Sequence, residues 1–260
     1  MTTASLQGMR AAFVKAELPN AIQTLTKREA SLPAAPPDVH VYFYLGLDNL
    51  KVGLWMNMLD MPPDASLPYL ARAGDHFARF IGVLDRANEL ETLELLHVWC
   101  TILAFAATPA AESLAAAADI VLERVSDPRA LRELVRLLRG YLQRGEIASA
   151  DYAEFQRNVT EADDSDHAGL ASLLATGLWC AVRCDAATWN AALQLLSEQH
   201  ALAAETSLER HPFGWLNLLG MAVLRAGLEL GMRPEYTSPY LPEALAWRAI
   251  ARSPRSWYAR

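Results

Sequence analysis

Two residues three positions apart, Glu94 and His97, could together hold a metal ion. In a helix this spacing puts both side chains on one face, as in the carboxylate metal sites of helical bundles. Such sites also need a second Glu-x-x-His pair and two further glutamates, and the sequence has no second pair. Two interpretations therefore stay open. The residues are a pair of metal ligands, or a glutamate near a helix start and one polar group in a packed helix.

Acidic side chains are concentrated between Glu146 and Asp166. This stretch has seven carboxylates and one arginine, Arg157, so its formal charge is −6, whereas the whole chain carries −7. Clustered carboxylates can bind a divalent cation, and they can attract a basic partner through complementary potential. A solvated helix surface is the third interpretation. The residues that we predict to contact a partner are Asp151, Glu154, Glu161, Asp163, Asp164 and Asp166.

Nucleophilic catalysis has little support in the sequence. There is no Gly-x-Ser-x-Gly elbow, no Walker loop and no Gly-x-Gly-x-x-Gly motif. Arg72 and His76 share one side of an expected helix, but their spacing is one residue shorter than that of the Arg-and-His pairs in helical ribonucleases. His200 continues an apolar stripe and is expected to be a packed histidine. We therefore expect a protein that is not an enzyme, without catalytic residues, metal or cofactor.

The three cysteines, Cys100, Cys180 and Cys184, cannot all pair within one chain. We expect buried, reduced thiols, as in a cytoplasmic protein, because no further Cys or His pair provides zinc spacing. The start of the sequence has no apolar stretch of signal-peptide length. The longest apolar run, residues 95–107, is shorter than the ~18 residues that suggest a membrane span. These features predict a cytoplasmic protein without a membrane partner.

Helical periodicity runs through nearly the whole chain and would position these residues. From Leu131 the apolar side chains recur at the i, i+3, i+4, i+7 spacing of an amphipathic helix, with arginines between them. The nearest approach to a strand, His40–Leu45, is short and runs into a helical pattern. We predict helices near residues 5–28, 44–59, 67–84, 89–107, 110–125, 128–144, 148–160, 166–182, 186–204, 212–230 and 240–251.

Helix starts and ends are marked by specific residues. Asp185 and Ser238-Pro239 are predicted to begin helices, because they offer a capping oxygen or a fixed φ. Gly231 is predicted to end a helix in the left-handed conformation, with Pro234 preventing its continuation. The segment 91–107 is apolar almost all round, which predicts a central helix covered by the others.

The composition agrees with one all-α domain. The chain has 260 residues, of which 52% are hydrophobic and 20% charged, and this excludes a disordered chain. No stretch is long and polar enough to be a linker, so residues 1–260 are predicted to form a single helical bundle, or stacked helical hairpins, of about ten helices. A basic aromatic tail is expected near residues 252–260. The net charge of −7 argues against a nucleic-acid partner.

Three C-terminal segments carry a resemblance to a known family: His211–Ala222 (HPFGWLNLLGMA), Ala226–Gly231 (AGLELG) and Ser238–Pro242 (SPYLP). Together they resemble the C-terminal signature of the immunity protein 49 family, in which an apolar helix ends at a glycine and a short extended segment follows. The resemblance implies an all-helical bacterial immunity protein. Such a protein binds and neutralises a toxin that is encoded beside it, and the resemblance implies no catalytic residue.

We therefore expect a protein that neutralises a cognate toxin by direct binding and occlusion in the cytoplasm. Its acidic residues predict a toxin with a basic surface, and nuclease toxins have such surfaces because they bind phosphates. Two alternatives stay open. One is a metal-dependent helical enzyme whose ligands are Glu94 and His97, or else Asp163, Asp164 and Asp166. The other is a helical scaffold that binds a peptide in a groove.

Overall fold

All regular structure in the described part of the chain is helical. The computed structural model describes residues 3–33, 38, 40–83, 92–106, 129–161, 165–206, 208 and 212–253. No strand occurs in these ranges, which confirms the predicted all-α fold, and the helix predicted over 110–125 lies outside them. The α-helices are α1 (Thr3–Ala30), α2 (His40–Met58), α3 (Pro63–Val83), α4 (Thr92–Phe105), α6 (Arg129–Arg144), α7 (Ser149–Thr160), α8 (Ser165–Val182), α9 (Ala186–Glu205), α10 (Leu218–Glu229) and α11 (Glu243–Arg252), and the 3-10 helix is η1 (Pro212–Trp215).

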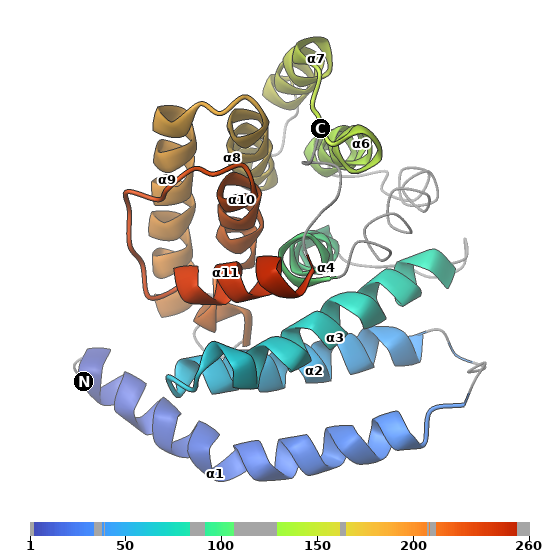
Figure 1. Cartoon of the computed structure of the whole chain (residues 1–260), viewed down its shortest axis with the longest axis vertical. Coiled ribbons are helices and arrows are strands. Elements are labelled where there is room, and N and C mark those ends of the chain that lie inside the picture. The colour runs from blue at the N-terminus through green and yellow to red at the C-terminus, as the bar shows by residue number, and fades with distance from the viewer. Residues whose placement is uncertain are drawn as a thin grey trace.

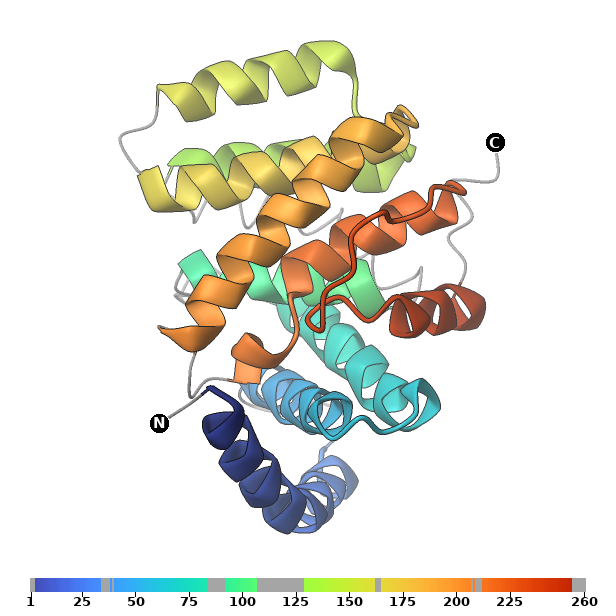
Figure 2. The ribbon, with the colours of Figure 1, turned by 90° about the vertical axis from the view of Figure 1, so that its left-hand side faces the viewer.

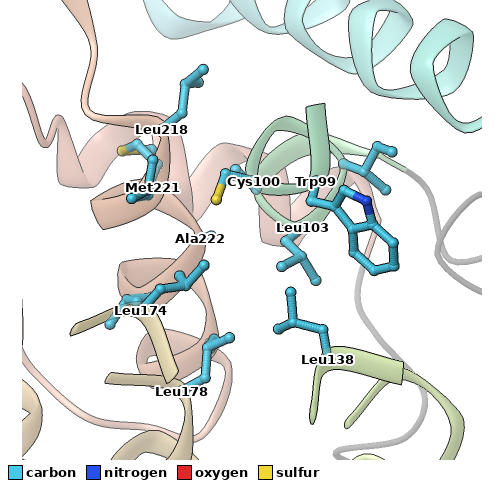
Figure 3. Packing of buried hydrophobic residues seen from close by; sticks show 14 of the residues in the cluster. Trp99, Cys100, Leu103, Leu138, Leu174, Leu178, Leu218, Met221 and Ala222 are labelled. Carbon is cyan, nitrogen blue, oxygen red and sulfur yellow. The ribbon is translucent and has the colours of Figure 1, made fainter. Parts of the chain in front are cut away.

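Helix α4 lies at the centre of the core, as its apolar sequence predicts. Its residues 96–105 are all buried, and it contacts α3 on one side and α10 on another. Figure 3 shows Trp99, Cys100 and Leu103 of α4 among leucines of α6 and α8 and apolar residues of α10. Each large apolar side chain buried here contributes ~1.5–3 kcal/mol before chain entropy is subtracted. The larger of two apolar clusters is therefore built around this helix.

The first three helices form a layer along one side of the molecule (Figure 1). Helices α2 and α3 run side by side as a hairpin, and α1 lies against α2. The contact between α1 and α2 is a second, smaller apolar cluster in which Val14 and Leu25 pack with Val52 and Trp55. Helix α1 bends near its middle (Figure 1), where Pro19 removes one amide donor from the helix.

Helices α6, α7 and α8 form the opposite end of the molecule (Figure 2). Helix α7 contacts α6 and α8, while α8 and α9 pair with each other and α10 lies against α4 and α8. The amphipathic stripe predicted from Leu131 onward is confirmed in α6. Leu134, Leu138 and Tyr141 are buried, whereas Arg132 and Arg136 are exposed.

Three helices end in the same backbone pattern, at Asp60, Cys184 and Gly231. Each of these residues has a positive φ, of 53°, 57° and 80° respectively. In each case its own amide and the next one donate to carbonyls of the last helical turn, which is the Schellman arrangement. Gly231 confirms its predicted left-handed end. Asp60 and Cys184 adopt this conformation with a Cβ, at a cost of roughly 1–2 kcal/mol each.

The helix boundaries predicted at residues 212–230 and at Ser238 were wrong, each for a local reason. The segment 212–230 is not one helix, because Asn217 leaves the helical path and its side chain accepts a hydrogen bond from the Gly220 amide at 2.9 Å. It thereby caps α10 and separates it from η1. Ser238 does not begin a helix: its hydroxyl accepts from the Tyr240 amide in a turn, and α11 begins later, at Glu243.

The predictions for two of the three cysteines and for the cap of α9 are confirmed, and the prediction for the third cysteine is wrong. All three thiols are free, and Cys100 and Cys180 are buried as expected. The expected burial of Cys184 was wrong, because α8 ends at Val182 and Cys184 lies in the exposed turn that follows. Asp185 caps α9 as predicted, since its side chain accepts from the Thr188 amide at 3.2 Å.

A fully buried arginine joins three helices. The Nε of Arg225 in α10 donates to the Glu229 carboxylate at 2.9 Å. Its terminal nitrogens donate to the carbonyl oxygen of Ala104, at 2.9 Å, and to that of Ser253. These carbonyls belong to the ends of α4 and α11, where the helix itself offers no donor. One side chain therefore ties α4, α10 and α11 together.

Candidate functional site

The acidic residues predicted to contact a partner are partly described. Asp151, Glu154 and Glu161 are exposed on and just after α7, whose opposite face is buried through Tyr152, Phe155 and Val159. Asp163 and Asp164 lie outside the described residues. Asp166 is in the first turn of α8, and its side chain is not described. The structure therefore places three of the six predicted carboxylates at one solvent-facing helix.

A basic helix lies next to this acidic segment. Helix α6 packs against α7 and contains five arginines and one glutamate, so its formal charge is +4. The glutamate, Glu133, is nearly buried, and it accepts hydrogen bonds from Arg136 at 2.9 Å and from Asn158 of α7 at 3.1 Å. The sequence did not predict this neighbourhood. It means that the potential of the acidic segment is partly offset on the side of α6.

The Glu94 and His97 spacing does not lead to a described metal centre. His97 is buried, with its ring stacked on that of Phe213 at 4.3 Å between centroids. The side chain of Glu94 is not among those described. Across the described part of the chain, no group of three His, Cys, Asp or Glu side chains is arranged to hold a metal ion.

Arg72 and His76 do share one side of α3, and both face a glutamate from α1. Asn49 donates to Glu29 Oε1 at 2.8 Å and its own Oδ1 accepts from Arg72 Nε at 3.1 Å. His76 Nε2 lies 3.6 Å from the same glutamate oxygen. Burial lowers the pKa of His76, and the nearby Glu29 carboxylate opposes this effect. The contacts of this network join α1, α2 and α3.

A recess of about 410 Å³ lies where α1, the ends of α2 and α9, η1 and the segment before α11 meet. Its volume falls in the range of about 300–1,000 Å³ that is usual for ligand pockets. The lining combines polar with aromatic and other apolar side chains from segments far apart in the sequence. Its lining residues include Arg10, Asn57, Met58, Asp60, Trp215 and Tyr240.

His200 supports one wall of this recess. Its Nε2 lies 3.3 Å from the carbonyl oxygen of Gly214, and its ring meets the Tyr240 ring edge to face at 5.0 Å. Burial lowers the pKa of His200 to about 4, so the ring is neutral at pH 7 and Nε2–H donates to that carbonyl. The backbone of Tyr240 is fixed as well, because its carbonyl accepts from the Asn217 amide at 3.0 Å.

Burial and two charged residues influence the Tyr240 hydroxyl. Burial is the largest influence and raises the pKa of Tyr240, the negative charge of Glu205 raises it further, and the positive charge of Arg10 lowers it. Arg10 and Glu205 are therefore both within electrostatic reach of this phenol. Asp60 also lines the recess, and its conformation is fixed by the hydrogen-bonded turn that ends α2.

Aromatic rings continue from the recess to the surface. The Trp215 ring lies 6.1 Å from that of Trp55, which in turn meets Phe13 edge to face at 6.2 Å. Phe13 is 60% exposed, the second-highest value among the exposed large hydrophobic residues described. The recess is thus one end of a row of rings contributed by α1, α2 and η1.

The recess beside Tyr240 was not predicted from the sequence. Trp215 and Tyr240 lie in the segments that carry the family resemblance, which implies no catalytic residue there. Arg10, Asn57 and Asp60 give no local signal, because each lies in or just after an ordinary helix and they come together only in the folded chain. No spacing rule links residues 10, 60 and 240.

No helix in the described ranges combines the length and the apolar character needed to cross a bilayer. Comparison of the chain with models of known families, with curated proteins and with solved structures finds no match.

Proposed function

We propose that this protein neutralises a cognate bacterial toxin by binding it directly, with the outward face of α7 contacting a basic surface of that toxin. The observation that carries the proposal is the geometry of α7. Its apolar face is fixed against α6 and α8, and Asp151, Glu154 and Glu161 are presented to solvent. Carboxylates on a fixed helix can accelerate association with a basic partner and set its orientation, because the backbone that carries them is already ordered before binding.

The position of α6 limits which toxin surfaces can bind against α7. A toxin that is basic over a wide area would also meet Arg132 and Arg136, which are exposed on the neighbouring helix. Like charges across an interface are unfavourable. The complementary basic region is therefore expected to be a strip about as wide as one helix, with neutral or acidic groups opposite α6.

The C-terminal region supports the proposal through local structure. The helix of the resembling segments, α10, ends at Gly231 in a left-handed cap, and Leu241 of the SPYLP segment is buried against the core. This is the arrangement that the resemblance to the immunity protein 49 family implies for these residues.

The first experiment is co-expression of the tagged protein with the product of the adjacent gene. The proposal predicts a neighbour that is toxic when expressed alone, cells that survive when both are present, and a stable complex on gel filtration. A harmless neighbour that does not bind would contradict the proposal.

The contribution of α7 is tested by a triple variant, Asp151→Ser, Glu154→Ser and Glu161→Ser. Association should slow by about tenfold or more at low salt, and the salt dependence of the rate should weaken. A matched control removes three exposed carboxylates elsewhere, by Asp64→Ser, Glu198→Ser and Glu235→Ser. Equal rates for the two variants would show that the interface does not include α7.

A further inference from the structure

The recess beside Tyr240 has the features of a ligand site that is independent of the acidic surface on α7. The two lie in different parts of the molecule, since the recess is formed with α1 and α2 while α7 is at the opposite end (Figure 2). The ligand proposed for this recess is therefore independent of the proposed toxin binding.

Opposite charges come from the two long N-terminal segments that line the recess. Arg10 on α1 supplies a guanidinium, whose fork of N–H donors suits a carboxylate. Asp60 supplies a carboxylate, which accepts hydrogen bonds from an ammonium group. Asn57, three residues before Asp60, adds an amide that can donate and accept. The polar part of the lining therefore contains one cation and one anion.

The rest of the lining suits an apolar ring. Trp215 and Tyr240 offer aromatic surface, and Met58 and Pro239 add further apolar area. These aromatic residues are held in place by contacts outside the recess: Trp215 by Trp55, and Tyr240 by His200. Aromatic rings prefer offset or edge-to-face contacts with other rings, and fixed walls lose little entropy on binding.

We propose that this recess binds an aromatic group carrying an ammonium and a carboxylate, as in an aromatic amino acid, with the ring against Trp215 and Tyr240, the carboxylate toward Arg10 and the ammonium toward Asp60. The same chemistry could be provided by the free amino acid or, in part, by an aromatic residue at the end of a peptide. A C-terminal residue offers the carboxylate alone, and an N-terminal residue offers the ammonium alone.

Four compounds separate these sources: L-phenylalanine, N-acetyl-L-phenylalanine, L-phenylalaninamide and N-acetyl-L-phenylalaninamide. They carry both charges, the carboxylate alone, the ammonium alone and neither charge. Each compound is added to the protein up to a compound concentration of about 20 mM, and binding is followed by saturation-transfer NMR. L-phenylalanine should bind with a Kd of about 1 mM or below. The compound with neither charge should bind at least about tenfold more weakly.

Single substitutions connect each charge of the ligand with its residue. Arg10→Gln should weaken the two carboxylate compounds by about tenfold and leave L-phenylalaninamide unchanged. Asp60→Asn should weaken the two ammonium compounds by about tenfold and leave N-acetyl-L-phenylalanine unchanged. Asparagine is compatible with the left-handed conformation that this position requires. Such a crossed pattern would not arise from a general loss of structure.

Blocking the recess provides the control for location. Ala11 lines it, so Ala11→Phe should abolish binding of all four compounds. Ala12 is the next residue on the same helix, is exposed and does not line the recess, so Ala12→Phe should leave binding unchanged.

Three results would overturn the proposal. The first is no saturable binding of L-phenylalanine to the wild-type protein, the second is equal affinity for all four compounds, and the third is equal binding by the two phenylalanine variants. If the carboxylate compound alone or the ammonium compound alone binds as tightly as L-phenylalanine, the zwitterion is also excluded, and the occupant is the corresponding peptide end.

Discussion

At the scale of single residues, His200 shows how burial changes chemistry. It lies on α9 beside the recess and was expected only as a packed histidine in an apolar stripe. Its ring is held between the Gly214 carbonyl and the Tyr240 ring, and the residue is partly buried. A histidine in this setting is stable when neutral, because the charged form would lose most of its hydration.

This environment predicts a pH-dependent stability. The pKa of His200 is about 4 in the folded chain and ~6.5 when unfolded, so the unfolded state binds more protons between these values. The contribution of His200 to the free energy of unfolding should therefore be greatest above pH ~6.5, and it should fall by roughly 2–3 kcal/mol as the pH falls to about 4.

Urea unfolding at several pH values measures this effect. His200→Gln keeps an N–H donor for Gly214 but does not titrate in this range, so its stability curve should be flatter between pH 6.5 and 4. His76, whose pKa is also lowered by burial, stays in both proteins and accounts for a remaining slope of the same sign. Parallel curves for the two proteins would show that His200 does not cause the dependence.

At the scale of helices, close packing depends on residues without side chains. Gly227 on α10 faces Trp189 of α9 so closely that a Cβ at this position would lie 2.2 Å from the indole carbon Cζ2. Trp189 has no room to move, because it is fully buried and its Nε1 donates to the Val223 carbonyl at 3.1 Å. The distance between α9 and α10 is therefore set by this glycine.

We expect Gly227→Ala to lower the free energy of unfolding by about 1–3 kcal/mol, because the helices must separate or the indole must leave its position. Gly169→Ala is the matched control. Gly169 is also inside a helix, but it is exposed and has no atom within 4 Å of an added Cβ. Since alanine favours helices over glycine, Gly169→Ala should raise stability by up to about 1 kcal/mol. Similar melting temperatures for the two variants would contradict this account.

The helices themselves could be predicted because each carries its own periodic pattern and its own end signals. The stripe in α6, the cap at Asp185 and the glycine end at Gly231 all depend on residues within one turn of each other. The separation of η1 from α10 was missed although Asn217 is a strong capping residue, because apolar residues on both sides continue the helical period. The recess could not be predicted, since it depends on how five segments meet.

At the scale of the whole molecule, Arg225 joins segments that are far apart in the sequence. It bonds a carbonyl 121 positions earlier in the chain and another 28 positions later. The side chains of Arg225 and Glu229 are both nearly inaccessible to water. A buried ion pair of this kind adds little stability relative to apolar residues, but removing the arginine is strongly destabilising, because the buried acceptors that it contacts lose their donor.

Arg225→Met should therefore destabilise the protein by about 3–5 kcal/mol, measured by urea unfolding at pH 7. Arg248→Met serves as the control. Arg248 lies on the surface, 3.7 Å from Asp64, and should change stability by no more than about 0.5 kcal/mol. Similar changes in stability for Arg225→Met and Arg248→Met would contradict this account.

The bonds of Arg225 also set an order of events during synthesis. A ribosome that has just added Arg225 must add 28 more residues before Ser253, one of its acceptors, exists, which takes about 1–6 s at about 5–20 residues per second. During this interval the nascent chain can pair α1, α2 and α3, but it cannot complete the bonds that join α4, α10 and α11. The core around α4 is thus expected to close only after α11 has emerged, and the nascent chain exposes apolar surface to chaperones until then.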